Sequence, residues 1–412
     1  MAVDGPARHR TDRQPVIPKA EYAERRKVAA ASSRELGYSG LIVWSRGGGT
    51  FDNFGDVLYL TNHYASFPWI NDKPPVWTGR GGAAALIRSD GESELVVDIP
   101  DYRADLVDVD RVEVDPNVYR GVVTSARRLG LHSGTVGLVG LEAMPAAAYR
   151  YLVASLPDAN FKDADDLVMK QRSRKSPAEL EMLRYASGIG MEITRAMLEQ
   201  AVEGATDGDC AAAGLAHGAR IPNVASWDLP FASGPASGHF VWPRLPQHDA
   251  ARLYQAGDLV HPDNYGYVNG YMYDLVRTRV VGDHPADWQK EIIEGAAGCV
   301  HAITDKLRPG VRVGELFDVG KNFLIKSGFT DEVEFAKSFP CFGHQAGLAF
   351  DDPWIARGIE DESVVVEPGA VWAIEVEVGR NGHAAGFEDL VLMDHTGAVE
   401  VLTASLPIHW GW

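Results

Sequence analysis

The chain has few cysteines and no long apolar run. Three of its 412 residues are cysteines, widely spaced at Cys210, Cys299 and Cys341. This usage does not fit a disulfide framework and indicates a reducing compartment. No apolar stretch is long enough to span a bilayer, and the polar, basic segment Met1–Gln14 lacks the apolar core of a secretory signal. We therefore expect a cytoplasmic protein with no membrane partner.

Basic charge and a phosphate-binding loop are also lacking. Lysine and arginine number 39 against 57 aspartates and glutamates, which gives a net charge of −18. Because nucleic acids are bound through basic patches, we expect no nucleic-acid partner. The glycine run Arg46–Gly49 has neither the Gly-Lys-Ser/Thr ending nor the following helix of a phosphate loop, so an ordinary loop is predicted.

The length of the chain predicts two domains. Residues 1–172 contain a helix at 20–36, buried strands such as 57–60 and further helices, a pattern that indicates an α/β domain. Residues 173–412 form the second domain, which mixes strands and helices. It opens at Ser176–Glu179 with an N-cap serine, a proline at the first helical position and a capping-box glutamate, so a helix begins there.

The first of two matched stretches in the second domain runs from Asp263 to Asp274. Its dipeptide Asn269-Gly270 favours a two-residue hairpin turn, because both central positions of that turn need positive φ. With this turn, Asp263 faces Val276 across the hairpin. Asp274 lies two residues from Val276, so the two aspartates share one face as diagonal neighbours.

The second stretch runs from Glu375 to Glu388. Asn381-Gly382 gives the same turn signal and places the two glutamates directly opposite each other. Like charges in that position destabilise a sheet, so both acidic pairs call for a compensating cation. The alternative is a pair of surface hairpins with solvated acids. The matched parity of the two pairs favours the cation.

A histidine lies between the two acidic hairpins. His344 has Gly343 before it and Gly347 three residues later, and glycines let the backbone approach closely. Four carboxylates and one imidazole make a hard, mainly oxygen site suited to Mn²⁺, Fe²⁺, Co²⁺ or Zn²⁺. Such carboxylates could bridge two ions a few ångströms apart.

These motifs resemble those of the pita-bread metallohydrolases, a family that includes methionine aminopeptidase, aminopeptidase P, prolidase and creatinase. The matching segments are Gly257–Asp263, Gly270–Thr278, Gly343–Leu348, Glu367–Glu375 and Phe387–Asp389. The resemblance covers about residues 170–405. It implies a creatinase-like α/β N-terminal domain, an α+β pita-bread catalytic domain and a homodimer. It also implies two divalent cations held by Asp263, Asp274, His344, Glu375 and Glu388.

The resemblance also suggests residues that contact the substrate. Ser233–His239 is similar to a family segment that supplies a histidine, which makes His239 a candidate proton donor or substrate contact. His248 is a rival, because His239 stands further from Asp263 than is usual in the family. In the aromatic, proline-rich loop at 67–77, Trp69 and Trp77 are candidates for the wall of a partner's active site.

Three positions depart from the peptidase pattern. Asp351 stands where the peptidases carry a second histidine, Val376 replaces a common proline, and Gly386 replaces the arginine of proline-specific peptidases. Asp351 could bind a cationic substrate, take part in catalysis or join the metal shell, and the alternative is an ordinary loop aspartate. The tryptophans Trp227, Trp242 and Trp354 could form a cation–π wall for such a substrate.

The resemblance implies a metal-dependent hydrolase that cleaves a C–N bond in a dipeptide or small polar amide with metal-activated water. Glu375 would help to move the proton, and a neutral His239 would assist the leaving group. Creatinase lacks the metal ligands, whereas this sequence keeps all five. Two alternatives remain open: a metal-dependent lyase of the dimethylsulfoniopropionate-lyase type, and a non-catalytic binding homologue.

Overall fold

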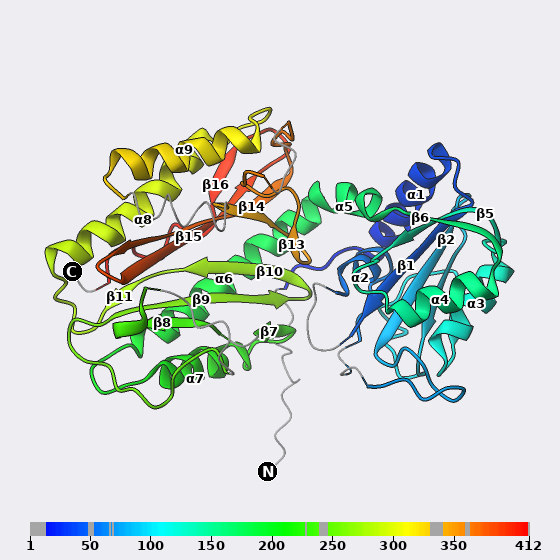
Figure 1. The fold of residues 1–412 in the computed structure, drawn as a ribbon, viewed down its shortest axis with the longest axis horizontal. Coiled ribbons are helices and arrows are strands. Elements are labelled where there is room, and N and C mark those ends of the chain that lie inside the picture. The colour runs from blue at the N-terminus through cyan, green and yellow to red at the C-terminus, as the bar shows by residue number, and fades with distance from the viewer. Residues whose placement is uncertain are drawn as a thin grey trace, which may run out of the picture. The chain divides into compact units, whose positions relative to one another are not determined.

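The structure is a computed structural model that describes residues 14–47, 53–65, 67, 70–226, 229–238, 246–329, 341–358 and 363–410. The chain divides into two compact units, Ile17–Arg172 and Ser173–Trp412, the second of which also includes the segment before Ile17. Figure 1 labels most of their helices and strands.

The first unit is a six-stranded mixed sheet with helices. Its strands are β1 (Gly40–Arg46), β2 (Gly82–Arg88), β3 (Ser93–Val97), β4 (Arg111–Val114), β5 (Ser133–Val139) and β6 (Asp158–Asp163). Its helices are α1 (Lys19–Glu35), α2 (Gly55–Thr61), α3 (Val118–Arg128), α4 (Ala146–Ser155) and α5 (Asp165–Ser173). The strand order is β4-β3-β2-β1-β5-β6, and β1 is antiparallel to β2 and parallel to β5.

Residues 57–60 lie in α2, so the predicted strand at this place is wrong. Every residue of α2 except Asp56 is buried. A short helix that is buried nearly all round shows no 3.6-residue period, and periodicity alone cannot separate it from a buried strand.

The second unit contains four α-helices in its described part, α6 (Pro177–Glu199), α7 (Asp207–Gly218), α8 (Asp287–Lys306) and α9 (Val313–Lys326). The predicted start of α6 is confirmed. Ser176 Oγ accepts a hydrogen bond from the Glu179 N–H at 3.2 Å, and Glu179 Oε2 accepts one from the Ser176 N–H at 2.9 Å. This capping box satisfies two N–H groups at the start of the helix.

The second unit contains two five-stranded sheets in its described part (Figure 1). The first contains β7 (Val224–Ser226), β8 (Phe231–Ser233), β9 (Leu259–Val268), β10 (Tyr271–Val276) and β11 (Arg279–Val280). The second contains β12 (Gly343–Ala346), β13 (Phe350–Asp351), β14 (Ala370–Arg380), β15 (His383–Met393) and β16 (Val399–Val401), in the order β13-β12-β14-β15-β16.

Both predicted hairpin turns are confirmed. Asn269 and Gly270 have φ of 52° and 87°, and Asn381 and Gly382 have φ of 55° and 82°. These are the left-handed conformations that a two-residue hairpin turn requires at both central positions.

The predicted register of each hairpin is confirmed as well. Asp263 pairs with Val276 across β9 and β10, and Glu375 pairs with Glu388 across β14 and β15. A shift of one residue would move every one of these side chains to the opposite face of its sheet. The turn dipeptides therefore decide on which face the acids lie.

Strand β14 has an apolar face and an acidic face. Trp372, Ile374 and Val378 are fully buried in the core of the unit, where α8 packs on β14 and β15. Glu375 and Glu377 alternate with these apolar residues, so they project from the other face. The same alternation that builds the core thus presents two carboxylates together.

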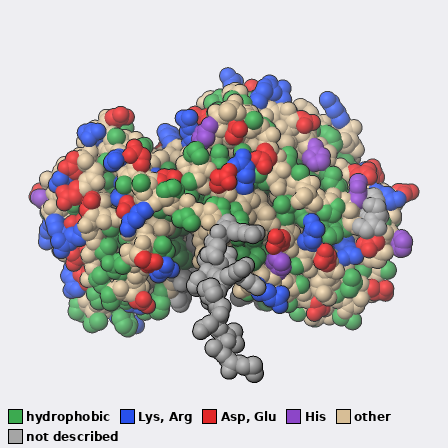
Figure 2. All heavy atoms as spheres, turned by 180° about the vertical axis from the view of Figure 1, so that it is seen from behind, with side chains coloured by type: hydrophobic (Ala, Val, Ile, Leu, Met, Phe, Trp, Pro, Cys, Tyr) green, Lys and Arg blue, Asp and Glu red, His purple; other side chains and the backbone are tan. Residues whose placement is uncertain are grey.

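No helix in the described part of the chain is both long enough and apolar enough to cross a membrane. On the face of the molecule drawn in Figure 2, acidic and basic side chains are interspersed.

Candidate metal centre

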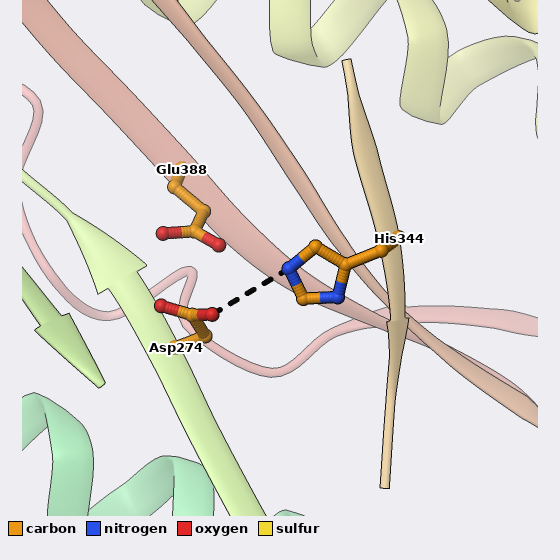
Figure 3. A group of neighbouring side chains, drawn as sticks. All are labelled: Asp274, His344 and Glu388. Atoms are coloured by element: carbon orange, nitrogen blue, oxygen red, sulfur yellow. Dashed lines mark ion pairs between the residues drawn. The ribbon is translucent and has the colours of Figure 1, made fainter. Parts of the chain in front are cut away.

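Three buried side chains from three strands meet in the second unit. Asp274 of β10, His344 of β12 and Glu388 of β15 each offer one ligand atom, and these atoms lie within 4.8 Å of one another. Figure 3 shows the three side chains pointing toward a common space. Their exposed fractions are only 1–3%. Three residues far apart in sequence are therefore gathered where water has little access.

His344 is held in one tautomer. Its Nδ1 lies 2.8 Å from the backbone oxygen of Gln345, and a carbonyl oxygen only accepts, so Nδ1 carries the hydrogen. The lone pair of Nε2 then faces the acids, with Asp274 Oδ2 at 3.6 Å. Burial lowers the pKa of His344 to about 4. The neutral ring, fixed by a backbone carbonyl, is the form in which histidine binds metals.

Of the two buried carboxylates, Glu388 lacks a hydrogen-bond donor among the described residues. Both oxygens of Glu388 are buried, and neither has a hydrogen-bond partner among the described residues. The pKa of Glu388 is raised well above its usual value, first by burial and then by the charges of Asp274, Glu375 and Asp263. Burial is also the main cause that raises the pKa of Asp274. A buried charge without a partner is costly, so this donor set fits a divalent cation.

Asp263 and Glu375 lie beside the three buried residues. Their charges act on both Asp274 and Glu388, and both side chains are partly exposed. Burial, followed by the charges of Glu375 and Glu377, raises the pKa of Asp263 well above its usual value. Burial raises the pKa of Glu375 to about 7. The expected fourth and fifth ligands therefore stand on the more open side of the same acidic group.

Glu377 and His261 lie beside this acidic group, and the sequence motifs do not predict them. Glu377 lies two residues after Glu375 on the same face of β14, and burial together with the charge of Glu375 raises its pKa to about 8. Glu377 Oε1 is 3.7 Å from His261 Nδ1, and His261 Nε2 is 2.9 Å from the backbone oxygen of Ser237. The period of two along β14 was the signal that could have found Glu377.

Arg277 ties the two acidic hairpins together. Its guanidinium is buried and donates to the backbone oxygens of Val276, at 3.0 Å, and Glu388. It also donates to Asp389 Oδ1 at 2.6 Å and lies 4.0 Å from the centre of the Phe387 ring. The end of β10 and the ligand-bearing part of β15 are therefore held by one planar cation.

Asp351 lies in a buried ion pair with Lys175. Its side chain is 1% exposed, and its Oδ2 lies 3.2 Å from Lys175 Nζ. Asp351 pairs with Gln345 across β12 and β13, whereas His344 precedes Gln345 and projects from the opposite face of β12. The expected role of Asp351 in catalysis or substrate binding stays a prediction.

Four of the expected aromatic and histidine residues, Trp69, Trp227, His239 and Trp242, lie outside the described residues. The rival His248 is partly buried, with its ring 6.5 Å from that of Phe231. Trp77 is 37% exposed on the first unit. Trp354 does lie at the site, because its ring centre is 4.9 Å from that of His344.

Two protein families match the chain. Metallopeptidase family M24 matches residues 181–395, and the creatinase/prolidase N-terminal domain matches residues 25–174. The matches agree with the expected α/β N-terminal domain followed by a pita-bread domain. The expected fold is therefore confirmed.

Curated relatives and solved structures agree with these families. An Xaa-Pro dipeptidase of Pyrococcus furiosus is 30% identical over 58% of this chain and 65% of its own length, which is less than two thirds of that protein. The ectoine hydrolase of Halomonas elongata is 23% identical over 72% of this chain and 73% of its own. An Xaa-Pro dipeptidase structure from Bacillus anthracis has a TM-score of 0.73 at 20% identity, covering 94% of this chain and 98% of that one.

Proposed function

Because the chain belongs to metallopeptidase family M24, we propose that it is a metal-dependent hydrolase that cleaves a C–N bond of a dipeptide or another small polar amide. The observation that carries this proposal is the buried group of Asp274, His344 and Glu388. A neutral imidazole of fixed tautomer beside the buried carboxylates of Asp274 and Glu388, the second of which has no donor among the described residues, suits a divalent cation.

The residues that would hold one or two such cations are Asp263, Asp274, His344, Glu375 and Glu388. Mn²⁺, Fe²⁺, Co²⁺ and Zn²⁺ all suit this donor set. A divalent cation bound there lowers the pKa of water and polarises a carbonyl group. The site itself would supply orientation, through the fixed ring of His344 and through Arg277, which holds the backbone of Glu388.

Glu375 is the residue we propose to move the proton. It is partly exposed. A carboxylate that water can reach can accept a proton at its oxygen and return it. Asp274 and Glu388 are more deeply buried, which suits holding a cation better than exchanging protons with solvent.

For the substrate, we propose a neutral or cationic small amide. One relative is named an Xaa-Pro dipeptidase and another an ectoine hydrolase, and both names fit a small C–N substrate. A Cβ at Gly386 would lie 2.6 Å from Val276 Cγ1, so no side chain fits at the position that is arginine in proline-specific peptidases. Glu377 stands opposite Gly386 and adds an acid there, which disfavours a substrate carboxylate at this place.

The test combines metal content with a substrate panel. Protein purified without chelators is analysed for metals and assayed on Xaa-Pro dipeptides, their amides, creatine, ectoine and dimethylsulfoniopropionate in ¹⁸O-labelled water. The proposal predicts bound metal and a product that carries ¹⁸O, with activity lost in His344→Ala. Turnover without ¹⁸O incorporation would instead indicate a lyase, and metal-free inactive protein would indicate a binding homologue.

We also propose that the chain works in the cytoplasm as a homodimer. The support is the family resemblance, together with three cysteines that are all free thiols. Light scattering of the purified protein tests the assembly: a mass near twice 44.8 kDa is expected, and a monomer mass would contradict it.

A further inference from the structure

A buried ion pair lies directly behind the histidine of the metal centre. Lys175 Nζ is 3.2 Å from Asp351 Oδ2, and each side chain is 1% exposed. Lys175 precedes α6, and Asp351 ends the short strand β13. Removing one partner of a buried pair leaves an uncompensated charge, which destabilises the fold strongly. Each residue therefore depends on the other.

Gln345 links this pair to His344. Lys175 Nζ donates to Gln345 Oε1 at 2.8 Å, and the backbone oxygen of Gln345 accepts from His344 Nδ1 at 2.8 Å. The backbone N–H of Lys175 also donates to the Gly369 oxygen at 2.7 Å, next to the start of β14. A short chain of contacts thus runs from Lys175 to the ring that faces the carboxylates.

Gly347 links the pair to Asp274 as well. A Cβ at Gly347 would lie 2.0 Å from Asp351 Oδ2 and 3.2 Å from Lys175 Cε, so the ion pair packs directly against this glycine. The Gly347 oxygen accepts a hydrogen bond from the Met272 N–H at 2.8 Å. Met272 lies on β10, two residues before Asp274. The strand of Asp274 is therefore hydrogen-bonded to the glycine against which the ion pair packs.

We propose that Lys175 and Asp351 are positioning residues that set the cation affinity of the centre. The pair contacts Gln345, whose backbone oxygen accepts from His344 Nδ1. It also packs on Gly347, whose oxygen accepts from Met272 on the strand of Asp274. This inference rests on the ligand set given under the proposed function. It assigns to Asp351 the role of positioning the metal ligands, in place of a contact with substrate.

The test compares the single variants Lys175→Met and Asp351→Leu with the double variant. Each single variant leaves one buried charge and is expected to unfold at a lower temperature. The double variant buries no charge, so its thermal stability without metal returns toward that of the wild type. Its dissociation constant for Mn²⁺, measured by calorimetry, is nevertheless expected to rise about 10-fold or more, as for other residues that orient metal ligands.

Tyr254→Phe is the matched control in the same unit. It removes a buried hydrogen bond to Asp207 of 2.7 Å, and the other hydrogen-bond contacts of Tyr254, with Cys210 and the backbone of Gly204 and Ala205, involve no proposed ligand. It should lower the unfolding temperature and leave the Mn²⁺ dissociation constant unchanged.

A further variant tests the proposal if the variants at Lys175 and Asp351 do not fold. Gln345→Met retains the ion pair and removes the amide, and it too should weaken Mn²⁺ binding and alter the visible absorption spectrum of the Co²⁺-loaded protein. Wild-type affinity and spectrum in the double variant, or in Gln345→Met where only that variant folds, would overturn the inference. Failure of the wild type itself to bind Mn²⁺ or Co²⁺ would overturn the proposed ligand set instead.

Discussion

Glu388 is a charge that the described part of the fold leaves without a donor. Both of its oxygens are buried, and its neighbours are mainly other carboxylates. In the absence of a cation this residue opposes folding, because an unsatisfied buried group costs about 1–3 kcal/mol, and more when it is charged. A side chain that harms the metal-free fold is expected only where a bound ligand offsets the cost.

Replacing Glu388 by glutamine should therefore have two opposite effects. The shape is kept and the charge is lost, so the metal-free protein should gain about 1–3 kcal/mol of stability at pH 8. The Mn²⁺ dissociation constant should rise at least about 10-fold. Urea unfolding with a chelator and calorimetry measure the two effects.

The control is Glu400→Gln. Glu400 is 51% exposed and pairs with Arg184 at the surface, so both quantities should stay within error, with a stability change below about 0.5 kcal/mol. Unchanged Mn²⁺ affinity in Glu388→Gln would remove this residue from the ligand set.

The acids should also make the metal-free protein less stable as pH rises. Burial raises the pKa of Glu375 to about 7 and of Glu377 to about 8 in the folded state. The folded chain then holds protons that the unfolded chain has released, so stability is present at lower pH and is lost as pH rises through these values. Burial lowers the pKa of His261 and His344 to about 4. These two histidines change the stability with pH only below about pH 6.5, where the unfolded chain begins to protonate them.

The measurement is urea unfolding between pH 6.5 and 8.5, with a chelator or with saturating Mn²⁺. Stability is expected to fall with pH in chelator. Mn²⁺ should flatten or reverse the trend, because the cation favours the ionised acids. Rising stability of the metal-free protein across this range would contradict the account.

At the scale of elements, two hairpins and one short strand deliver the ligands. The hairpin turns fix the register, and Arg277 then holds β10 against β15. Gly382 has a φ of 82°, and a Cβ added to it would meet no atom within 4 Å, so its substitution tests backbone conformation alone.

Gly382→Ala should destabilise the protein by about 1–2 kcal/mol, because a Cβ disfavours the left-handed conformation. Gly188 is the matched control: it lies inside α6, also has open space around it and has no positive φ. Gly188→Ala should stabilise by about 0.5–1 kcal/mol, since glycine weakens a helix interior. The unfolding temperatures of both variants test this prediction. Equal shifts of the unfolding temperature in the same direction would argue against a strained turn.

The hairpins could be predicted because their information is local. A turn dipeptide and the alternation of a strand suffice to pair Glu375 with Glu388. The role of Asp351 could not be predicted in this way, because its partner Lys175 lies 176 residues away in sequence. The sequence predicts a strand at residues 57–60 for another reason: a short buried helix and a buried strand have the same apolar composition.

At the scale of the whole molecule, the family and the fold follow from motifs, whereas the substrate does not. The likeness to a solved dipeptidase at 20% identity establishes the fold alone. Substrate choice depends on the shape and charge of the pocket, which hydrophobic periodicity does not encode. Position 386 illustrates this, because only the structure reveals that Val276 and His261 leave no room for a side chain there.

The most direct measurement is a crystal structure of the Mn²⁺-loaded protein with anomalous diffraction at the manganese edge. The account predicts one or two strong anomalous peaks within about 2.0–2.4 Å of oxygen or nitrogen atoms of Asp263, Asp274, His344, Glu375 and Glu388. A map with no peak among these five side chains, or with manganese bound elsewhere, would contradict it.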